Sequence, residues 1–260
     1  IIASKIFIKF CLECLEKSRL SCHDPNFIMN ICIIPARGGS KRIPRKNIKV
    51  FNGKKMILYS IKAAILSGCF DKVIVSTDDE EIARIAKENG ANVPFMRPSD
   101  LSGDYVATRP VINHAIDWLE ERGFNIDNVC CLYATAPFIQ AYDIKTAYKN
   151  LINSNADFCF SVTSFSFPIQ RAIMLTENDR VKMFNEKYMK TRSQDLVEAF
   201  HDAGQFYWGK AEAFKLEKPM FSECATPYIL QRHLVQDIDT KEDWDRAELM
   251  HKVVFESNHI

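Results

Sequence analysis

The sequence predicts an α/β fold in which helices cover both faces of a doubly wound, mostly parallel sheet. Three observations favour this class. Short β-branched or apolar runs alternate along the chain with longer segments of amphipathic helical spacing. The first apolar run, 31–34, lacks polar alternation, as is typical of a buried parallel strand. Finally, 260 residues of which 47% are hydrophobic suffice for one large domain or a domain with a modest insertion.

The first strand is followed directly by a loop, 35–47, that is rich in glycine, proline and cations. Gly38 and Gly39 lack Cβ atoms, so their N–H groups can approach a phosphate closely. No Asp or Glu occurs between Asn30 and Phe70, so no acidic side chain in that stretch offsets the positive charge. The loop therefore predicts an anion site, with a solvated basic turn as the alternative. The cations are Arg37, Lys41, Arg42, Arg45 and Lys46.

Several functional classes are not supported. The patterns G-x-x-x-x-G-K-S/T and G-x-G-x-x-G are absent, which argues against an ordinary ATPase or a dinucleotide-binding domain. The net charge is +1 and the cations of the loop lack interleaved aromatic residues, which argues against nucleic acid. Nine cysteines, several in apolar contexts, indicate reduced thiols, and we expect a cytoplasmic protein.

Residues 1–28 are expected to lie outside the fold, which we place at 29–260. The apolar run 1–10 is too short to span a bilayer and lacks a small-residue cleavage site. Cys11, Cys14, Cys22 and His23 suggest a zinc site only weakly, because a second well-spaced ligand pair is missing.

Spacing and turn signals place the next elements. A helix is predicted over 56–67, ending at Gly68, and a strand over 73–75. Asp78 follows that strand at its carboxyl end, where open α/β sheets bind ligands, although Asp78 or Asp79 can equally cap the next helix. Further helices are expected over 106–122 and 141–153, and further strands over 128–133 and 157–162. The strand–helix alternation then gives way to β-hairpin excursions over 161–185.

Two later stretches contain candidate site residues. In Gln205-Phe206-Tyr207-Trp208, alternation predicts Phe206 and Trp208 in the core and directs Gln205 and Tyr207 toward a ligand or the surface. In Asp237-Ile238-Asp239 the two carboxylates project from one face of an extended segment, an arrangement that suits Mg2+. Alternatively, Asp239 or Thr240 only caps the helix predicted over 241–254.

The loop and its surroundings resemble the cytidylyltransferases that activate nine-carbon keto-sugar acids, the CMP-sialic acid synthetase family. The core I-P-A-R-G-G-S-K-x-I-P-x-K-N is complete, and the match runs in order from about Met29 to Val254. The stretch 200–209 is most similar to members that use pseudaminic acid. The resemblance implies a glycosyltransferase-A-like Rossmann-type sheet, a β-rich dimerisation arm over about 161–190 that reaches the partner's active site, and a homodimer.

The same resemblance implies roles for individual residues. Lys41, Arg37 and Asp239 would be catalytic, and Asp237 and Asp239 would hold Mg2+. The nucleotide would be bound by Ala36, Arg37, Gly38, Gly39, Ser40, Lys41, Lys46, Asn47, Asp78 and Arg97. The sugar acid would be bound by Tyr133, Thr135, Arg192, Gln194, Gln205 and Tyr207.

The expected reaction is transfer of CMP from CTP to the anomeric hydroxyl of a nonulosonic acid, with release of pyrophosphate. Most sialic acid synthetases read Q-P-T-S-P where this chain has Tyr133 to Pro137, with Tyr133 and Ala136 in place of Gln and Ser. That departure favours pseudaminic acid over N-acetylneuraminic or legionaminic acid, which remain alternatives. A noncatalytic nucleotide-binding protein on the same scaffold is a more distant alternative.

Overall fold

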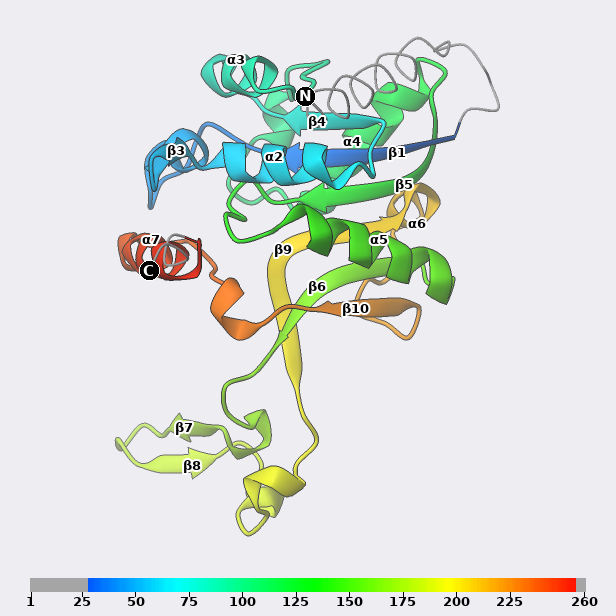
Figure 1. Cartoon of the computed structure of the whole chain (residues 1–260). Coiled ribbons are helices and arrows are strands. Elements are labelled where there is room, and N and C mark those ends of the chain that lie inside the picture. The colour runs from blue at the N-terminus through cyan, green and yellow to red at the C-terminus, as the bar shows by residue number, and fades with distance from the viewer. Residues whose placement is uncertain (1–27, 256–260) are drawn as a thin grey trace, which may run out of the picture.

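A mixed six-stranded sheet forms the centre of the protein (Figure 1). The computed structural model describes residues 28–255. The strand order is β10-β6-β9-β5-β1-β4, and β9 alone runs antiparallel to its two neighbours in this sheet. The predicted fold class, with its mainly parallel sheet, is confirmed. The strands are β1 (Ile28–Pro35), β4 (Lys72–Ser76), β5 (Asn125–Leu132), β6 (Phe158–Ser164), β9 (Phe200–Lys210) and β10 (Ala225–Ile229).

Helices pack on both faces of this sheet (Figure 1). One face is covered by α2 (Ile57–Ser67), α3 (Glu80–Glu88) and α5 (Ala141–Ser154), and the other by α4 (Thr108–Glu120) and α6 (Ala211–Lys215). Alternation along β9 directs Phe206 and Trp208 to the first face and Tyr207 to the second. Both Phe206 and Trp208 are fully buried, so their predicted place in the core is confirmed.

Local turn chemistry sets the helix ends as the sequence predicts. Gly68 follows α2 with φ 64°, a left-handed conformation that costs little without a Cβ atom. Asp79 precedes α3 and accepts a hydrogen bond from Ile82 N, so it is the N-cap. Of the two residues left open as caps by the sequence, Asp79 therefore caps the helix, and the Asp78 carboxylate is available for another contact.

A separate small core joins the start of the chain to its end. The hairpin of β2 (Val50–Phe51) and β3 (Lys54–Lys55) packs against α7 (Lys241–Phe255), with Phe51, Ile238 and Trp244 buried between them. The 3-10 helix η1 (Lys46–Ile48) connects the basic loop to this hairpin. This packing fixes the segment before α7 beside the basic loop.

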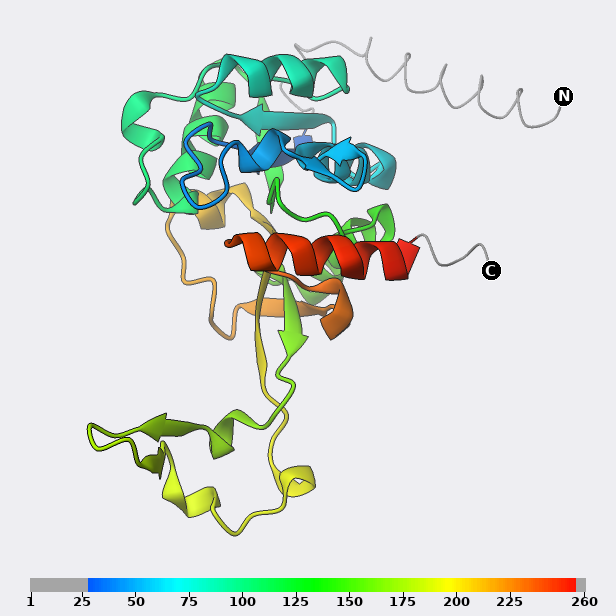
Figure 2. The same ribbon diagram turned by 90° about the vertical axis from the view of Figure 1, so that its left-hand side faces the viewer.

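The excursion expected from residue 161 onward forms an arm that projects from the sheet (Figures 1 and 2). Strand β6 continues to Ser164 because it still pairs with β9, where Thr163 faces His201. The arm itself, 165–199, contains the hairpin β7 (Ile173–Leu175) and β8 (Val181–Met183). Its 3-10 turns are η3 (Ile169–Arg171), η4 (Glu186–Tyr188) and η5 (Ser193–Asp195); elsewhere lie η2 (Ser99–Leu101) and η6 (Arg232–Leu234).

Some predictions fall outside the described residues. The excluded segment 1–28 lies outside them except for Ile28, and so do Cys11, Cys14, Cys22 and His23. Within 28–255, the six cysteines are all free thiols. None of the helices in this range is long and apolar enough to cross a bilayer.

Candidate functional site

A pocket opens at the carboxyl ends of β1, β4 and β5, where the sequence placed its candidates. The basic loop forms one side, and the segments after β4 and β5 and before α7 complete the lining. Nine of the predicted residues line it: Arg37, Ser40, Lys41, Lys46, Asn47, Arg97, Tyr133, Thr135 and Asp239. Predicted residues outside the lining are Ala36, Gly38, Gly39, Asp78, Arg192, Gln194, Gln205, Tyr207 and Asp237.

The basic loop is held in place by hydrogen bonds at both ends. Gly38 N donates to Asp78 Oδ1 at 2.9 Å, and Asn47 Nδ2 donates to Arg37 O at 2.9 Å. A Cβ atom at Gly38 would lie 2.7 Å from Asp79 Oδ2, so glycine is required for the close approach of the loop to the turn after β4. In this structure Asp78 and Asn47 therefore shape the loop, and the Gly38 N–H is already used.

Arg45 serves the loop in a different way from the other cations. Its guanidinium group pairs with both carboxylate oxygens of Asp79, and Nη2 lies 2.7 Å from Glu81 Oε2. The hydrogen bond from Arg45 lowers the pKa of Asp79, in spite of partial burial. The backbone of Arg45 has a left-handed conformation, with φ 56°, and the residue lies outside the pocket lining. It therefore fastens the loop to the start of α3 and does not face the pocket.

The remaining cations of the loop pair with two carboxylates. Arg37 Nη1 lies 2.6 Å from Asp104 Oδ1, and Lys41 pairs with the other oxygen of Asp104. Arg42 Nη2 lies 2.8 Å from Asp239 Oδ2, and Lys46 Nζ lies 3.2 Å from Asp239 Oδ1. The four cations thus meet at one pocket, where a polyphosphate could replace these carboxylates as their partner.

Arg97 adds a buried cation to the pocket. Its side chain is 7% exposed, and Nε donates to Ser76 Oγ at 3.0 Å while Nη2 donates to Ser76 O. No carboxylate among the described residues forms an ion pair with it, and burial lowers the pKa of its guanidinium. The nearby charge of Asp78 offsets this burial only in part, so a bound anion would recover free energy that the buried cation costs.

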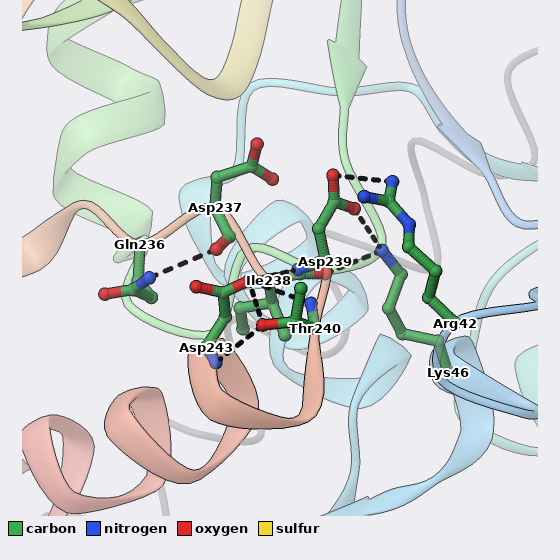
Figure 3. Close-up of polar contacts among 8 residues, drawn as sticks. All are labelled: Arg42, Lys46, Gln236, Asp237, Ile238, Asp239, Thr240 and Asp243. Carbon is green, nitrogen blue, oxygen red and sulfur yellow. Dashed lines mark hydrogen bonds and ion pairs between the residues drawn. The ribbon is translucent and has the colours of Figure 1, made fainter. Parts of the chain in front are cut away.

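Asp237 and Asp239 lie on the same side of the segment before α7 (Figure 3). Thr240 and Asp243 cap the helix: Asp243 N donates to Thr240 Oγ1, and Asp243 Oδ2 accepts from Thr240 N. Asp239 is therefore not the cap, and its carboxylate is available for the pocket. The segment pairs with no strand, in contrast to the strand-like stretch that the sequence suggested.

The two carboxylates fit a magnesium ion. Burial and the neighbouring Asp239 raise the pKa of Asp237, although Lys46 and Arg42 act in the opposite direction. Mg2+ takes one or two carboxylates and fills its other positions with water and substrate phosphates. Within 28–255, no group of three or more His, Cys, Asp or Glu side chains could hold a metal ion, so protein ligands here would come from these two carboxylates alone.

A group of aromatic and polar side chains lies at the β5 end of the pocket. Tyr133 and Thr135 line it, whereas Gln205 and Tyr207 are 1% and 8% exposed. The expectation that alternation directs Gln205 and Tyr207 toward a ligand or the surface does not match this burial. The Tyr207 hydroxyl points to Asp202, and α4 together with Tyr133 covers this face.

Arg192 and Gln194 are not brought to the pocket within the described chain. Both lie on the arm at η5, and Arg192 Nε pairs with Asp195 Oδ2 at 2.7 Å. A site that uses them would have to be completed by the arm of a second copy.

Sequence reasoning missed Asp104 and gave Arg42 no individual role. A lone aspartate such as Asp104 carries no sequence signal for an ion pair with Arg37, 67 positions away. For Arg42, the run of cations was a signal, but the sequence does not say which of them reaches Asp239.

The matched family model is described as "Cytidylyltransferase" and covers residues 31–255. The chain is 50% identical over 228 residues to a pseudaminic acid cytidylyltransferase of Campylobacter jejuni subsp. jejuni serotype O:2, covering 88% of this chain and 98% of that protein. It is 31% identical to a CMP-N,N'-diacetyllegionaminic acid synthase of Legionella pneumophila subsp. pneumophila, covering 84% and 94%. A CMP:2-keto-3-deoxy-manno-octonic acid synthetase complexed with CTP shares the fold, with a TM-score of 0.64, 15% identity, and coverage of 87% and 99%.

Proposed function

This chain belongs to the cytidylyltransferase family, and we propose that it transfers CMP from CTP to the anomeric hydroxyl of a nonulosonic acid. One observation carries the proposal. Four loop cations and the buried Arg97 meet at a single pocket, and Asp239 in its lining belongs to a carboxylate pair with Asp237 that suits a divalent cation. This arrangement fits a nucleoside triphosphate with its metal ion better than it fits any uncharged ligand.

The reaction needs no nucleophilic side chain. The anomeric hydroxyl attacks the α-phosphorus of CTP, a new P–O bond forms, and the bond to pyrophosphate breaks in line with it. The hydroxyl proton leaves to solvent, so atoms and charge balance. Arg37, Lys41 and Arg42 would hold the negative charge that builds up on the departing pyrophosphate.

Mg2+ is the proposed cofactor, held by Asp237 and Asp239. When bound, it neutralises phosphate charge and orients phosphate oxygens. Lys46 donates to Ile238 O at 2.7 Å and so fixes the segment that bears both aspartates. Its ammonium group thereby links the phosphate loop to the metal-binding segment.

Pseudaminic acid is the proposed acceptor. The 50% identity to a relative named for that acid supports this choice, and so does the unusual pocket sequence at Tyr133. The alternatives are N-acetylneuraminic acid and legionaminic acid, and the second is supported by the 31% identical relative. All three acids would use the same chemistry at the same pocket.

A homodimer and a cytoplasmic location complete the proposal. The arm exposes an apolar surface, with Phe167 82%, Leu175 72% and Phe184 66% exposed, which suits contact with a second copy. Such a contact is also the way in which Arg192 and Gln194 would reach a site. The free thiols of the described cysteines favour a reducing compartment.

Pyrophosphate release tests the proposal. The protein is supplied with Mg2+ and CTP, and with pseudaminic, N-acetylneuraminic or legionaminic acid in separate reactions. We expect release with pseudaminic acid. Release with only one of the other acids would support the proposed reaction but identify that acid as the substrate. Absence of release with all three, under conditions where CTP binding is measurable, would favour a noncatalytic nucleotide-binding protein.

A further inference from the structure

Asp202 accepts two hydrogen bonds beside the pocket, at the start of β9. The Tyr207 hydroxyl donates to Asp202 Oδ2 at 2.6 Å, and Gly204 N donates to Asp202 Oδ1 at 2.8 Å. Gly204 has φ 61°, a conformation that brings its N–H group back toward this carboxylate and that favours glycine. Both carboxylate oxygens are thus committed to donors within the same strand.

The chain of hydroxyl groups continues from Tyr207 toward the pocket. The rings of Tyr207 and Tyr133 lie 5.5 Å apart, and Tyr207 is a hydrogen-bond neighbour of the Tyr133 hydroxyl. The Tyr133 hydroxyl lies 3.1 Å from Thr108 Oγ1 at the start of α4. Of these residues, only Tyr133 lines the pocket. Burial raises the pKa of both tyrosines, so both hydroxyls keep their protons at neutral pH.

The carboxylate sets the direction of every hydrogen bond in this chain. A carboxylate only accepts, so Tyr207 gives its single proton to Asp202. The Tyr207 oxygen can then only accept from Tyr133, and the Tyr133 oxygen in turn accepts from Thr108 or from a ligand. The end of the chain that faces the pocket is therefore an acceptor, suited to an O–H or amide N–H group.

We propose that Asp202 and Tyr207 are positioning residues that determine recognition of the sugar acid through Tyr133. They orient the Tyr133 hydroxyl as a hydrogen-bond acceptor toward a hydroxyl or acylamino group of the acid. The inference rests on the proposed function, and it gives the buried Tyr207 a role that does not require contact with the substrate. The loop cations would hold CTP, so we expect its binding not to depend on these hydrogen bonds.

Asp202→Asn tests the direction of these hydrogen bonds, because asparagine has almost the same shape as aspartate. The backbone N–H of Gly204 needs an acceptor, so the asparagine Oδ1 faces Gly204 and its NH2 group faces Tyr207. Tyr207 then turns its proton toward the Tyr133 oxygen, and Tyr133 turns its own proton to Thr108 Oγ1 or to the pocket. We expect the KM for the sugar acid to rise at least about tenfold, because the Tyr133 hydroxyl loses the orientation in which it accepts from the substrate. The KM for CTP is expected to change less than about twofold.

A double-mutant cycle shows whether Asp202 acts through Tyr207. The Tyr207→Phe variant already lacks the hydroxyl that connects Asp202 to Tyr133. Adding Asp202→Asn to it should therefore leave the KM for the sugar acid unchanged. Asp117→Asn is the control for the loss of one negative charge, because this exposed residue lies on α4 and its only ion pair within residues 28–255 is with Lys215, at 3.9 Å. Thermal unfolding of each variant separates a local effect from loss of the fold.

The outcomes distinguish this inference from the proposed function. Absence of pyrophosphate release by the wild-type protein with every acid would overturn both. An active wild-type protein would overturn the inference alone in either of two cases: if Asp202→Asn leaves the KM for the sugar acid unchanged or raises the KM for CTP equally, or if its effect persists undiminished in the Tyr207→Phe background.

Discussion

The Nζ atom of Lys46 lies 3.2 Å from Oδ1 of Asp239, although 193 positions separate the two residues in the chain. The contact joins the loop after β1 to the segment before α7. It places a cation that we propose to bind phosphate beside a carboxylate that we propose to bind the metal ion, and a metal-bound triphosphate needs both. Five predictions follow from this pocket and from the elements that support it.

Asp239→Asn should reduce magnesium-dependent pyrophosphate release at least about 100-fold, because it removes one of the two proposed metal ligands. The fold should persist, since Thr240 and Asp243 cap α7 without it. The control is Asp245→Asn, an exposed residue that pairs only with Lys241 among the described residues. Full activity of Asp239→Asn at ordinary Mg2+ concentrations would contradict the metal assignment.

Arg97→Met should raise the KM for CTP about tenfold or more while leaving the thermal stability of the ligand-free protein equal or higher. The guanidinium is buried and forms no ion pair with a carboxylate of residues 28–255, and burial outweighs the nearby charge of Asp78, so removing its charge relieves a desolvation cost. Ser76 O keeps a donor, because Ala36 N lies 2.9 Å from it. Calorimetry of the free protein and CTP kinetics measure the two effects. A marked fall in stability together with an unchanged KM would show that Arg97 serves the fold alone.

Asp104→Asn should lower the KM for CTP by about two- to fivefold. Asp104 forms ion pairs with Arg37 and Lys41, so a triphosphate that binds these cations must displace it. The effect is small because the pairs are exposed to solvent and screened by it. Asp100→Asn, which removes the same charge four positions away, is the matched control. If KM rises instead, Asp104 preorganises the two cations and does not compete with CTP.

Asp79→Asn should destabilise the protein by about 1 kcal/mol at pH 7, since asparagine retains the cap of α3 but loses the charge that pairs with Arg45. The pKa of Asp79 is lowered in the folded state, so its stabilising effect is complete above the unfolded pKa of about 3.9. The difference from wild type should shrink as pH falls through the lower folded value. Urea unfolding between pH 3 and 7 measures it, with Glu80→Gln as the control. A difference that stays constant with pH would exclude the ion pair as its cause.

Leu175→Asp on β7 should shift the protein from dimer to monomer in sedimentation velocity, because it places a charge on the exposed apolar surface of the arm. Pyrophosphate release should fall with it if Arg192 and Gln194 reach the pocket of a second copy. Lys182→Ala on the neighbouring strand β8 is the control, because it changes the arm without placing a charge on its apolar surface. A wild-type protein that sediments as a monomer would overturn the proposed homodimer.

Local chemistry was sufficient for much of the fold. The apolar run of β1, the glycine after α2 and the aspartate before α3 act within a few residues, so their roles could be predicted without tertiary information. The loop over 35–47 was also predictable as an anion site, because its cations and glycines are adjacent in sequence. The family resemblance then indicated the partner segment with Asp237 and Asp239.

Only the tertiary structure decided which charged groups meet. Arg45 lies within the basic loop but pairs with Asp79 and Glu81 outside the pocket. Asp104, which no sequence pattern singles out, forms ion pairs with Arg37 and Lys41. Tyr207 was expected on an accessible face, and α4 and Tyr133 bury it. Sequence alone determined the sheet, its turns and the presence of a loop rich in cations and glycine, since these depend on near neighbours. The partner of each charge and the accessible face of each strand depend on packing between distant segments, which no local pattern encodes.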